Sequence, residues 1–171
     1  MEQGAVIWIC GLAGSGKSTI ASALYKELKK DIPHIVHLDG DEIRDLLGFC
    51  GYDRQGRIKI ALKYSKLAHF LSSQGIFVIV STISLFNEIY THNRETLKNY
   101  REIFIQCPKE ELYRRDQKQL YSKALKGEIQ NVVGVDIAFD EPKPHIVVDN
   151  HKQDNLQGKV ADIIKQLNLK I

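Results

Sequence analysis

The residues that most clearly predict chemistry form one run near the N-terminus, Gly11-Leu12-Ala13-Gly14-Ser15-Gly16-Lys17-Ser18-Thr19. The run matches G-x-x-x-x-G-K-[ST], in which backbone amides approach phosphate oxygens, the lysine reaches the β- and γ-phosphates and the hydroxyl ligates magnesium. The plain alternative is a glycine-rich turn with an incidental lysine. We expect ATP to bind along Gly11 and Ala13 to Thr19, with Lys17 acting in catalysis and Ser18 holding Mg²⁺.

Two carboxylates, Asp39 and Asp41, follow the apolar run 35–38. Open α/β sheets build their sites at the carboxyl ends of parallel strands, where both side chains are then expected. Phosphoryl transfer needs mainly positioning and charge neutralisation, with a carboxylate orienting the attacking hydroxyl. Asp39 and Asp41 are both candidates for that role. The alternative is structural, because Asp-Gly favours a turn and Asp41 suits a helix N-cap.

The apolar pattern of the sequence predicts the strands and helices that position these residues. The run 5–10 is typical of a buried parallel strand, and a helix that begins near Lys17 directs its N-terminal dipole at the phosphates. Further strands are expected at 35–38, 76–80, 103–105 and 145–149, and long helices at 19–30, 55–73, 88–98 and 154–169. This alternation predicts a three-layer α/β fold of the P-loop NTPase type, with a mostly parallel sheet covered by helices on both faces.

The segment 117–144 has lysines, glycines, prolines and few periodic apolar positions. That composition indicates a mobile lid rather than core. A closing lid excludes water, so that the γ-phosphoryl group reaches an acceptor and is not lost to hydrolysis. The lid and the sheet together are expected to form a single domain over residues 1–171.

Composition excludes several classes of protein. The chain has 171 residues, of which 43% are hydrophobic and 26% charged, as in an ordinary globular domain. A net charge of +3 is too small to argue for nucleic acid as a partner. The three cysteines are far apart and odd in number, which favours reduced thiols. No apolar run approaches the roughly 18 residues of a membrane span, so a cytoplasmic protein without a membrane partner is expected.

The chain resembles adenylylsulfate kinases over nearly its whole length. The matching motifs, besides the phosphate loop, are Leu38-Asp39-Gly40-Asp41 with Arg44, Gly48-Phe49 with Asp53-Arg54, Ile83-Ser84, Arg115-Asp116-Gln117-Lys118 with Leu120-Tyr121, Gly127-Glu128-Ile129, Gly134-Val135-Asp136 and Glu141-Pro142. The resemblance implies an ATP- and Mg²⁺-dependent kinase that phosphorylates the ribose 3′-hydroxyl of a small nucleotide bearing a tetrahedral acidic group. It also implies a homodimer.

The resemblance assigns roles to individual residues. Arg115 and Lys118 are expected to join the phosphate loop in binding ATP. Phe49 is expected to stack on the acceptor base, and Arg44 and Arg54 to bind its phosphate-linked group. The full set of expected acceptor-binding residues is Asp41, Arg44, Phe49, Arg54, Arg57, Ile83, Ser84, Lys118, Leu120 and Val132.

The chain departs from the family pattern on the acceptor side. Arg57 stands where family members usually have asparagine, and Val132 replaces a lid phenylalanine that closes over adenine. Loss of one aromatic partner removes about 1–3 kcal/mol of stacking, which favours a different base. We therefore expect the acceptor to be cytidine diphosphoramidate, used by family relatives that modify capsule or other surface polysaccharides. Adenylylsulfate is the alternative acceptor, and a bare P-loop ATPase or nucleotide switch is the alternative of another class.

Overall fold

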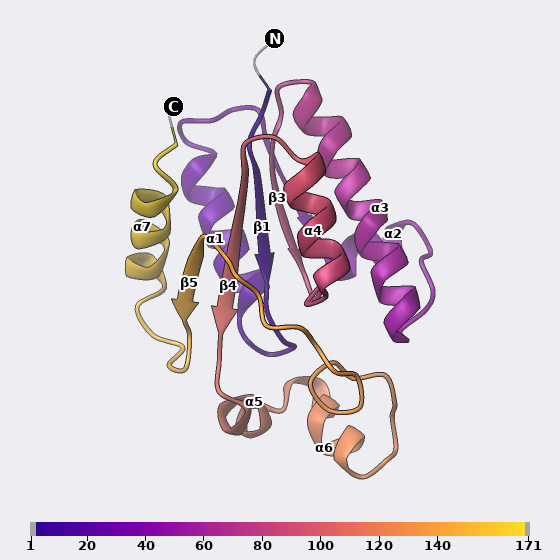
Figure 1. The fold of residues 1–171 in the computed structure, drawn as a ribbon. Coiled ribbons are helices and arrows are strands. Elements are labelled where there is room, and N and C mark those ends of the chain that lie inside the picture. The colour runs from indigo at the N-terminus through magenta and orange to yellow at the C-terminus, as the bar shows by residue number, and fades with distance from the viewer. Residues whose placement is uncertain (1–2, 170–171) are drawn as a thin grey trace.

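The computed structural model describes residues 3–169 and contains one five-stranded sheet in the order β2-β3-β1-β4-β5 (Figure 1). Every neighbouring pair of strands is parallel. The strands are β1 Val6–Cys10, β2 Ile35–Asp39, β3 Phe77–Thr82, β4 Tyr100–Gln106 and β5 Ile146–Asp149. The predicted α/β class is confirmed, and all carboxyl ends of the strands meet at one edge of the sheet.

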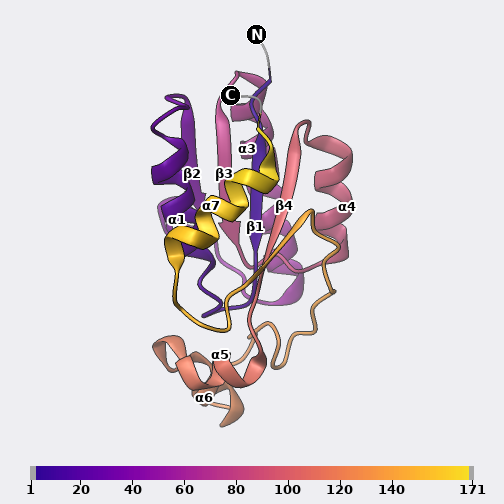
Figure 2. The same cartoon turned by 90° about the vertical axis from the view of Figure 1, so that its left-hand side faces the viewer.

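Helices cover both faces of the sheet, as expected. The helices α1 Lys17–Leu28 and α7 Leu156–Leu167 pack on one face, and α3 Arg54–Ser73 and α4 Asn87–Thr96 cover the other (Figures 1 and 2). The strand β1 alternates between the two cores, because Val6 and Trp8 join one apolar cluster and Ile7 and Ile9 join the other. A strand buried on both faces explains the continuous apolar run that predicted it.

Some elements are longer than their apolar runs. The strand β3 continues through Ser81 and Thr82, and β4 includes Arg101 and Glu102. Glu102 is buried, and it accepts a hydrogen bond of 2.9 Å from Arg94 of α4. A buried carboxylate that pairs with an arginine of another element leaves no local signal in the sequence, so the apolar run marks only the middle of β4.

The segment 117–144 is more structured than its composition predicts. It contains the short helices η1 Gln117–Gln119 and α6 Leu120–Leu125, beneath the carboxyl edge of the sheet and beside α5 Lys109–Arg115 (Figure 1). Its buried side chains are Tyr121, Val132, Val133 and Ile137, which belong to the core on the α3 side. The expectation that this segment contributes little to the core is therefore wrong. Among the helices of residues 3–169, none has the length and apolarity needed to cross a membrane.

Candidate active site

The loop between β1 and α1 has the conformation that phosphate binding requires. Gly14 and Gly16 have φ of 76° and 93°, values that residues with a Cβ rarely adopt. Gly16 is the N-cap of α1 and makes no side-chain cap, so the first amides of the helix stay available to an anion. A Cβ on Gly16 would lie 2.3 Å from the side-chain amide nitrogen Nδ2 of Asn150, so the loop also needs glycine for space.

Side chains from three other segments donate hydrogen bonds to the backbone carbonyls of this loop. The carbonyls of residues 13, 14 and 15 accept hydrogen bonds from the hydroxyl of Tyr121 (2.7 Å), the guanidinium of Arg115 (3.0 Å) and the amide of Asn150 (2.7 Å), respectively. Arg115 also donates to the carbonyl of Asn150 and to the carboxylate of Glu111. Three consecutive carbonyls are thus bound, which orients the peptide units of the loop before any ligand arrives.

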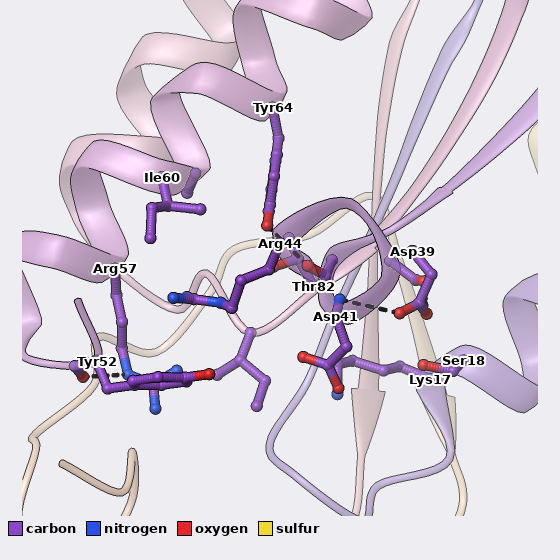
Figure 3. Close-up of a pocket in the computed structure, with 14 residues that line it drawn as sticks. Lys17, Ser18, Asp39, Asp41, Arg44, Tyr52, Arg57, Ile60, Tyr64 and Thr82 are labelled. Atoms are coloured by element: carbon purple, nitrogen blue, oxygen red, sulfur yellow. Dashed lines mark hydrogen bonds between the residues drawn. The ribbon is translucent and has the colours of Figure 1, made fainter. Parts of the chain in front are cut away.

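Asp39 ends β2 and lies beside the start of α1 (Figure 3). Its carboxylate accepts hydrogen bonds from the hydroxyl of Ser81 at 2.8 Å and from the amide of Asp41 at 3.0 Å. Burial acts to raise the pKa of Asp39, but the hydrogen bonds from Ser18, Ser81 and the Asp41 amide outweigh it, so this pKa lies below its ordinary value. Asp39 is therefore ionised at neutral pH, next to the Ser18 hydroxyl.

The Ser18 hydroxyl and the Asp39 carboxylate are a suitable donor set for magnesium. Mg²⁺ prefers oxygen ligands and is usually bound through one or two protein groups together with substrate phosphates. Within residues 3–169 no group of three or more His, Cys, Asp or Glu side chains is arranged to hold a metal by itself. The arrangement thus fits an ion shared with a nucleotide rather than one enclosed by protein.

Lys17 and Asp41 lie beside each other, on the side of the pocket that also holds Ser18 and Asp39 (Figure 3). Burial lowers the pKa of the Lys17 ammonium, and the carboxylates of Asp41 and Asp39 oppose that shift. No hydrogen bond involves the Asp41 carboxylate among the described residues, in contrast to that of Asp39. The two carboxylates therefore differ: Asp39 is held in place by its neighbours, whereas Asp41 is available to a ligand.

The turn between β2 and α2 (Gly40–Leu46) is closely packed. A Cβ on Gly40 would lie 2.8 Å from the hydroxyl of Thr82, so only glycine fits there. The Tyr64 hydroxyl of α3 donates to the Gly40 carbonyl at 2.7 Å. Burial raises the pKa of Tyr64 to about 12, so the phenol remains protonated as this donor. Together these contacts set the position of Asp41.

A pocket opens at the carboxyl ends of β2 and β3 and contains many of the expected residues (Figure 3). Its lining residues are Lys17, Ser18, Asp39, Gly40, Asp41, Arg44, Tyr52, Arg57, Ile60, Ala61, Tyr64, Ser81, Thr82 and Ile83. One end therefore carries the phosphate-loop lysine and both carboxylates, and the other end carries two arginines.

The two arginines shape the loop between α2 and α3. Arg44 donates to the carbonyl of Gly51 at 3.1 Å. Arg57 donates through Nε to the carbonyl of Tyr52 at 2.7 Å and through Nη2 to the carbonyl of Asn131 at 2.8 Å. Arg57 thereby connects α3, this loop and the segment 117–144. Burial and the nearby charge of Arg44 lower the pKa of Arg57, consistent with two cations that share one pocket wall.

Other expected acceptor residues lie outside this pocket lining. Phe49 packs on Tyr64 with ring centroids 6.2 Å apart. Arg54 makes a two-bond ion pair with Glu88, with nitrogen–oxygen distances of 2.8 and 3.1 Å. Both side chains are thus occupied by protein contacts in this structure.

Ser84 and the residues from segment 117–144 also lie away from the pocket lining. Ser84 is fully buried and accepts a hydrogen bond of 2.8 Å from the indole of Trp8. Val132 is buried in the core, Leu120 is partly buried against it, and Lys118 is exposed. A motif places Ser84 near the end of β3, but it does not determine that its hydroxyl points into the core.

Several residues of the site have no individual role in the sequence patterns, among them Ser81, Tyr64 and Asn150. Ser81 is the penultimate residue of β3 and Asn150 directly follows β5, so their position at strand ends could have indicated that both lie near the site. Tyr64, in the middle of α3, donates a hydrogen bond to the carbonyl of Gly40, and no local sequence pattern indicates this contact. Tyr52 follows a glycine in a loop whose course depends on the two arginines.

The sheet order, the phosphate loop with Lys17 and Ser18, and the paired carboxylates define the class: a P-loop phosphotransferase. The sequence matches the profile of the adenylylsulphate kinase family over residues 3–149. The chain belongs to the adenylylsulphate kinase family, as its motifs predict. The expected enzyme class, a kinase, is thereby confirmed.

Individual relatives agree with this assignment. The chain is 58% identical over 164 residues to the cytidine diphosphoramidate kinase of Campylobacter jejuni, covering 96% of each chain. It is 40% identical over 159 residues to the adenylyl-sulfate kinase of Pseudomonas aeruginosa, covering 90% of this chain and 80% of that protein. Its fold matches the Mycobacterium tuberculosis APS kinase CysC in complex with AMPPNP and APS, with a TM-score of 0.88, 29% identity, and coverage of 99% of this chain and 100% of that chain.

Proposed function

We propose that this chain transfers the γ-phosphoryl group of ATP to the ribose 3′-hydroxyl of cytidine diphosphoramidate. The observation that carries the choice of acceptor is the 58% identity to the Campylobacter jejuni kinase, against 40% to the Pseudomonas aeruginosa adenylyl-sulfate kinase. The presence of Arg57 in the pocket supports the same choice, because it supplies a cation where the family pattern has a neutral amide.

On the donor side, the amides of loop residues 11–16 and the N-terminus of α1 bind the β- and γ-phosphates. The Lys17 ammonium stays close to the γ-phosphoryl group during transfer and offsets its negative charge. Ser18 and Asp39 would hold Mg²⁺, which neutralises charge on the phosphates when bound. Arg115 acts through the carbonyl of Gly14, so its contribution is to keep the loop in its binding conformation.

On the acceptor side, Asp41 accepts the hydrogen bond of the 3′-hydroxyl and directs its oxygen at the γ-phosphorus. Among the described residues, the Asp39 carboxylate accepts hydrogen bonds from protein donors and the Asp41 carboxylate accepts none, which separates their roles. Arg44 and Arg57 bind the anionic tail of the nucleotide by charge-assisted hydrogen bonds. The enzyme thus works mainly by alignment and charge neutralisation.

Adenylylsulfate is the second candidate acceptor. It is favoured by the close match of the whole fold to the Mycobacterium tuberculosis APS kinase CysC, whose complex holds AMPPNP and APS. The two candidates share the 3′-hydroxyl and an anionic 5′-tail, and they differ in the base and in the end of that tail.

The reaction is tested by incubating the enzyme with ATP, Mg²⁺ and each acceptor, and locating the new phosphate on the ribose by phosphorus and proton NMR. We expect a 3′-phosphorylated product from cytidine diphosphoramidate, with Lys17→Ala as the inactive control. ATP hydrolysis without a phosphorylated nucleotide would contradict the transfer reaction. A product from adenylylsulfate alone would contradict the choice of acceptor.

A further inference from the structure

Tyr52 is an exposed aromatic side chain at the acceptor end of the pocket. The residue is 55% exposed and lines the pocket opposite the end that holds Ser18 and Asp39 (Figure 3). It belongs to the loop between α2 and α3, which the two pocket arginines hold in place. A large ring left half in solvent at the wall of a pocket offers apolar area that a ligand would cover.

The ring of Tyr52 is oriented by those arginines. The guanidinium carbon of Arg44 lies 4.4 Å from the centroid of the Tyr52 ring, and that of Arg57 lies 5.6 Å from it. Arg57 also donates to the Tyr52 carbonyl, so both the backbone and the side chain of this residue are positioned. Ring and cations therefore form one preformed surface, suited to a ligand that combines a planar ring with an anionic group.

Phe49, the aromatic residue of the family motif, is arranged differently. Its ring packs on Tyr64, and the ammonium of Lys63 lies 4.2 Å from its centroid. It is half-buried and does not line the pocket. A base that stacked on Phe49 would have to displace the Tyr64 ring or the Lys63 ammonium. Tyr52 also has a cation over its ring, but the residue remains 55% exposed and lines the pocket, so a base can reach the rest of its surface.

We propose that Tyr52 is a specificity-determining residue that stacks on the base of the acceptor nucleotide while Arg44 and Arg57 bind its anionic tail. This inference rests on the proposed function, since it concerns the acceptor of the same reaction. The ring contacts the acceptor and not ATP, because it lies at the arginine end of the pocket and away from the phosphate loop.

The test measures the KM for cytidine diphosphoramidate and the KM for ATP in Tyr52→Ala, Tyr52→Phe and Phe49→Ala. We expect Tyr52→Ala to raise the acceptor KM about 10-fold or more, in line with the loss of one base-stacking side chain, and to change the ATP KM less than about twofold. Tyr52→Phe keeps the ring and is expected to retain most of the affinity. Phe70→Ala, which removes an aromatic side chain that is 61% exposed on α3, is the matched control and should change neither constant.

The outcomes separate this inference from the proposed function. An unchanged acceptor KM in Tyr52→Ala, with normal transfer by the wild-type enzyme, overturns the role of Tyr52 alone. A raised acceptor KM in Phe49→Ala but not in Tyr52→Ala overturns it in favour of Phe49. Absence of transfer from the wild-type enzyme to cytidine diphosphoramidate overturns both proposals.

Discussion

The donor and acceptor ends of the pocket are held by different kinds of contact. At the donor end, backbone carbonyls of residues 13–15 are bound by side chains from three distant segments, and the loop has little freedom. At the acceptor end, Arg44 and Arg57 hold a loop whose Tyr52 side chain stays exposed. Substitutions at the donor end disturb buried and half-buried hydrogen bonds to the backbone, whereas the Tyr52 side chain at the acceptor end is 55% exposed. We propose that this difference lets one family fold accept different nucleotides.

The largest effect is expected from Lys17→Ala, which removes the cation of the donor end. We expect kcat to fall about 100- to 1,000-fold with either acceptor, because the lost charge acts on the transferring group itself. Steady-state kinetics checks this, and thermal unfolding confirms that the variant folds. Because Lys17 is assigned to the donor end, kcat should fall equally with both acceptors. A fall in kcat with only one acceptor would contradict that assignment.

Asn150→Ala tests whether the hydrogen bond from Asn150 to the Ser15 carbonyl stabilises the phosphate loop. The variant leaves the buried carbonyl of Ser15 without its partner, which costs about 1–3 kcal/mol and lowers Tm by about 2–10 °C. We expect a higher KM for ATP and an unchanged KM for the acceptor. The matched control is Gln166→Ala, an exposed amide on α7. A change in acceptor KM of the same size would show that the two ends are not independent.

Arg57→Lys tests the acceptor end while keeping the positive charge. A lysine cannot reproduce the two bonds that the guanidinium makes to the carbonyls of Tyr52 and Asn131. We expect the acceptor KM to rise about 10-fold, by the order of one charge-assisted hydrogen bond, and the ATP KM to stay within about twofold. Lys66→Ala, an exposed cation on α3, is the control. Equal effects on ATP and acceptor would contradict the assignment of Arg57 to the acceptor end.

The smallest effect concerns His37, which supports Asp39 from outside the pocket. Its Nε2 lies 2.9 Å from the Ser81 hydroxyl, which in turn donates to Asp39. Burial lowers the pKa of His37 below 6.5, so the unfolded chain binds its proton more readily than the folded protein. Stability from this group is therefore present above about pH 6.5 and is lost as the pH falls, by at most about 1.4 kcal/mol per pH unit.

Urea unfolding at pH 7.5 and at pH 5.5 measures this contribution, with His37→Gln as the non-titrating comparison. We expect the free energy of unfolding to fall less between these pH values in the variant than in the wild-type protein. Identical pH dependence in both would show that His37 does not titrate with folding.

Local patterns predicted the structure of the phosphate loop well, but not that Arg115, expected to bind ATP, donates to the carbonyls of Gly14 and Asn150. The phosphate loop, the strand before it and the helix after it are consecutive, so spacing and apolar periodicity suffice to identify them. The position of Asp39 and Asp41 at a strand end follows from the same logic. The hydrogen bonds to the loop could not be predicted in this way, because Tyr121 lies 108 residues from Ala13 and Asn150 lies 135 from Ser15. The position of Asn150 after a strand indicates that it lies near the site, but not that it bonds the Ser15 carbonyl.

The acceptor end was predicted less well, for a physical reason. Motifs indicate which segments come near the site, but the direction of each side chain depends on packing between segments. Ser84 turns toward Trp8, and Val132 turns into the core, although both were expected at the acceptor. The loop 47–54 carries two aromatic residues, Phe49 and Tyr52, and its composition suits base stacking, but the family motif indicates only Phe49. The exposure of Tyr52 and its place beside Arg44 appear only when the loop has folded.

The most direct test of the central claim is the ratio of kcat/KM for cytidine diphosphoramidate to that for adenylylsulfate, measured in parallel with saturating ATP and Mg²⁺. Our account combines a phosphate loop that keeps the family pattern with a pocket changed to bind cytidine diphosphoramidate. It therefore predicts that this ratio of kcat/KM is above one. A ratio below one would contradict the account, because it would identify the enzyme as an adenylylsulfate kinase whose pocket residues differ without a change of acceptor.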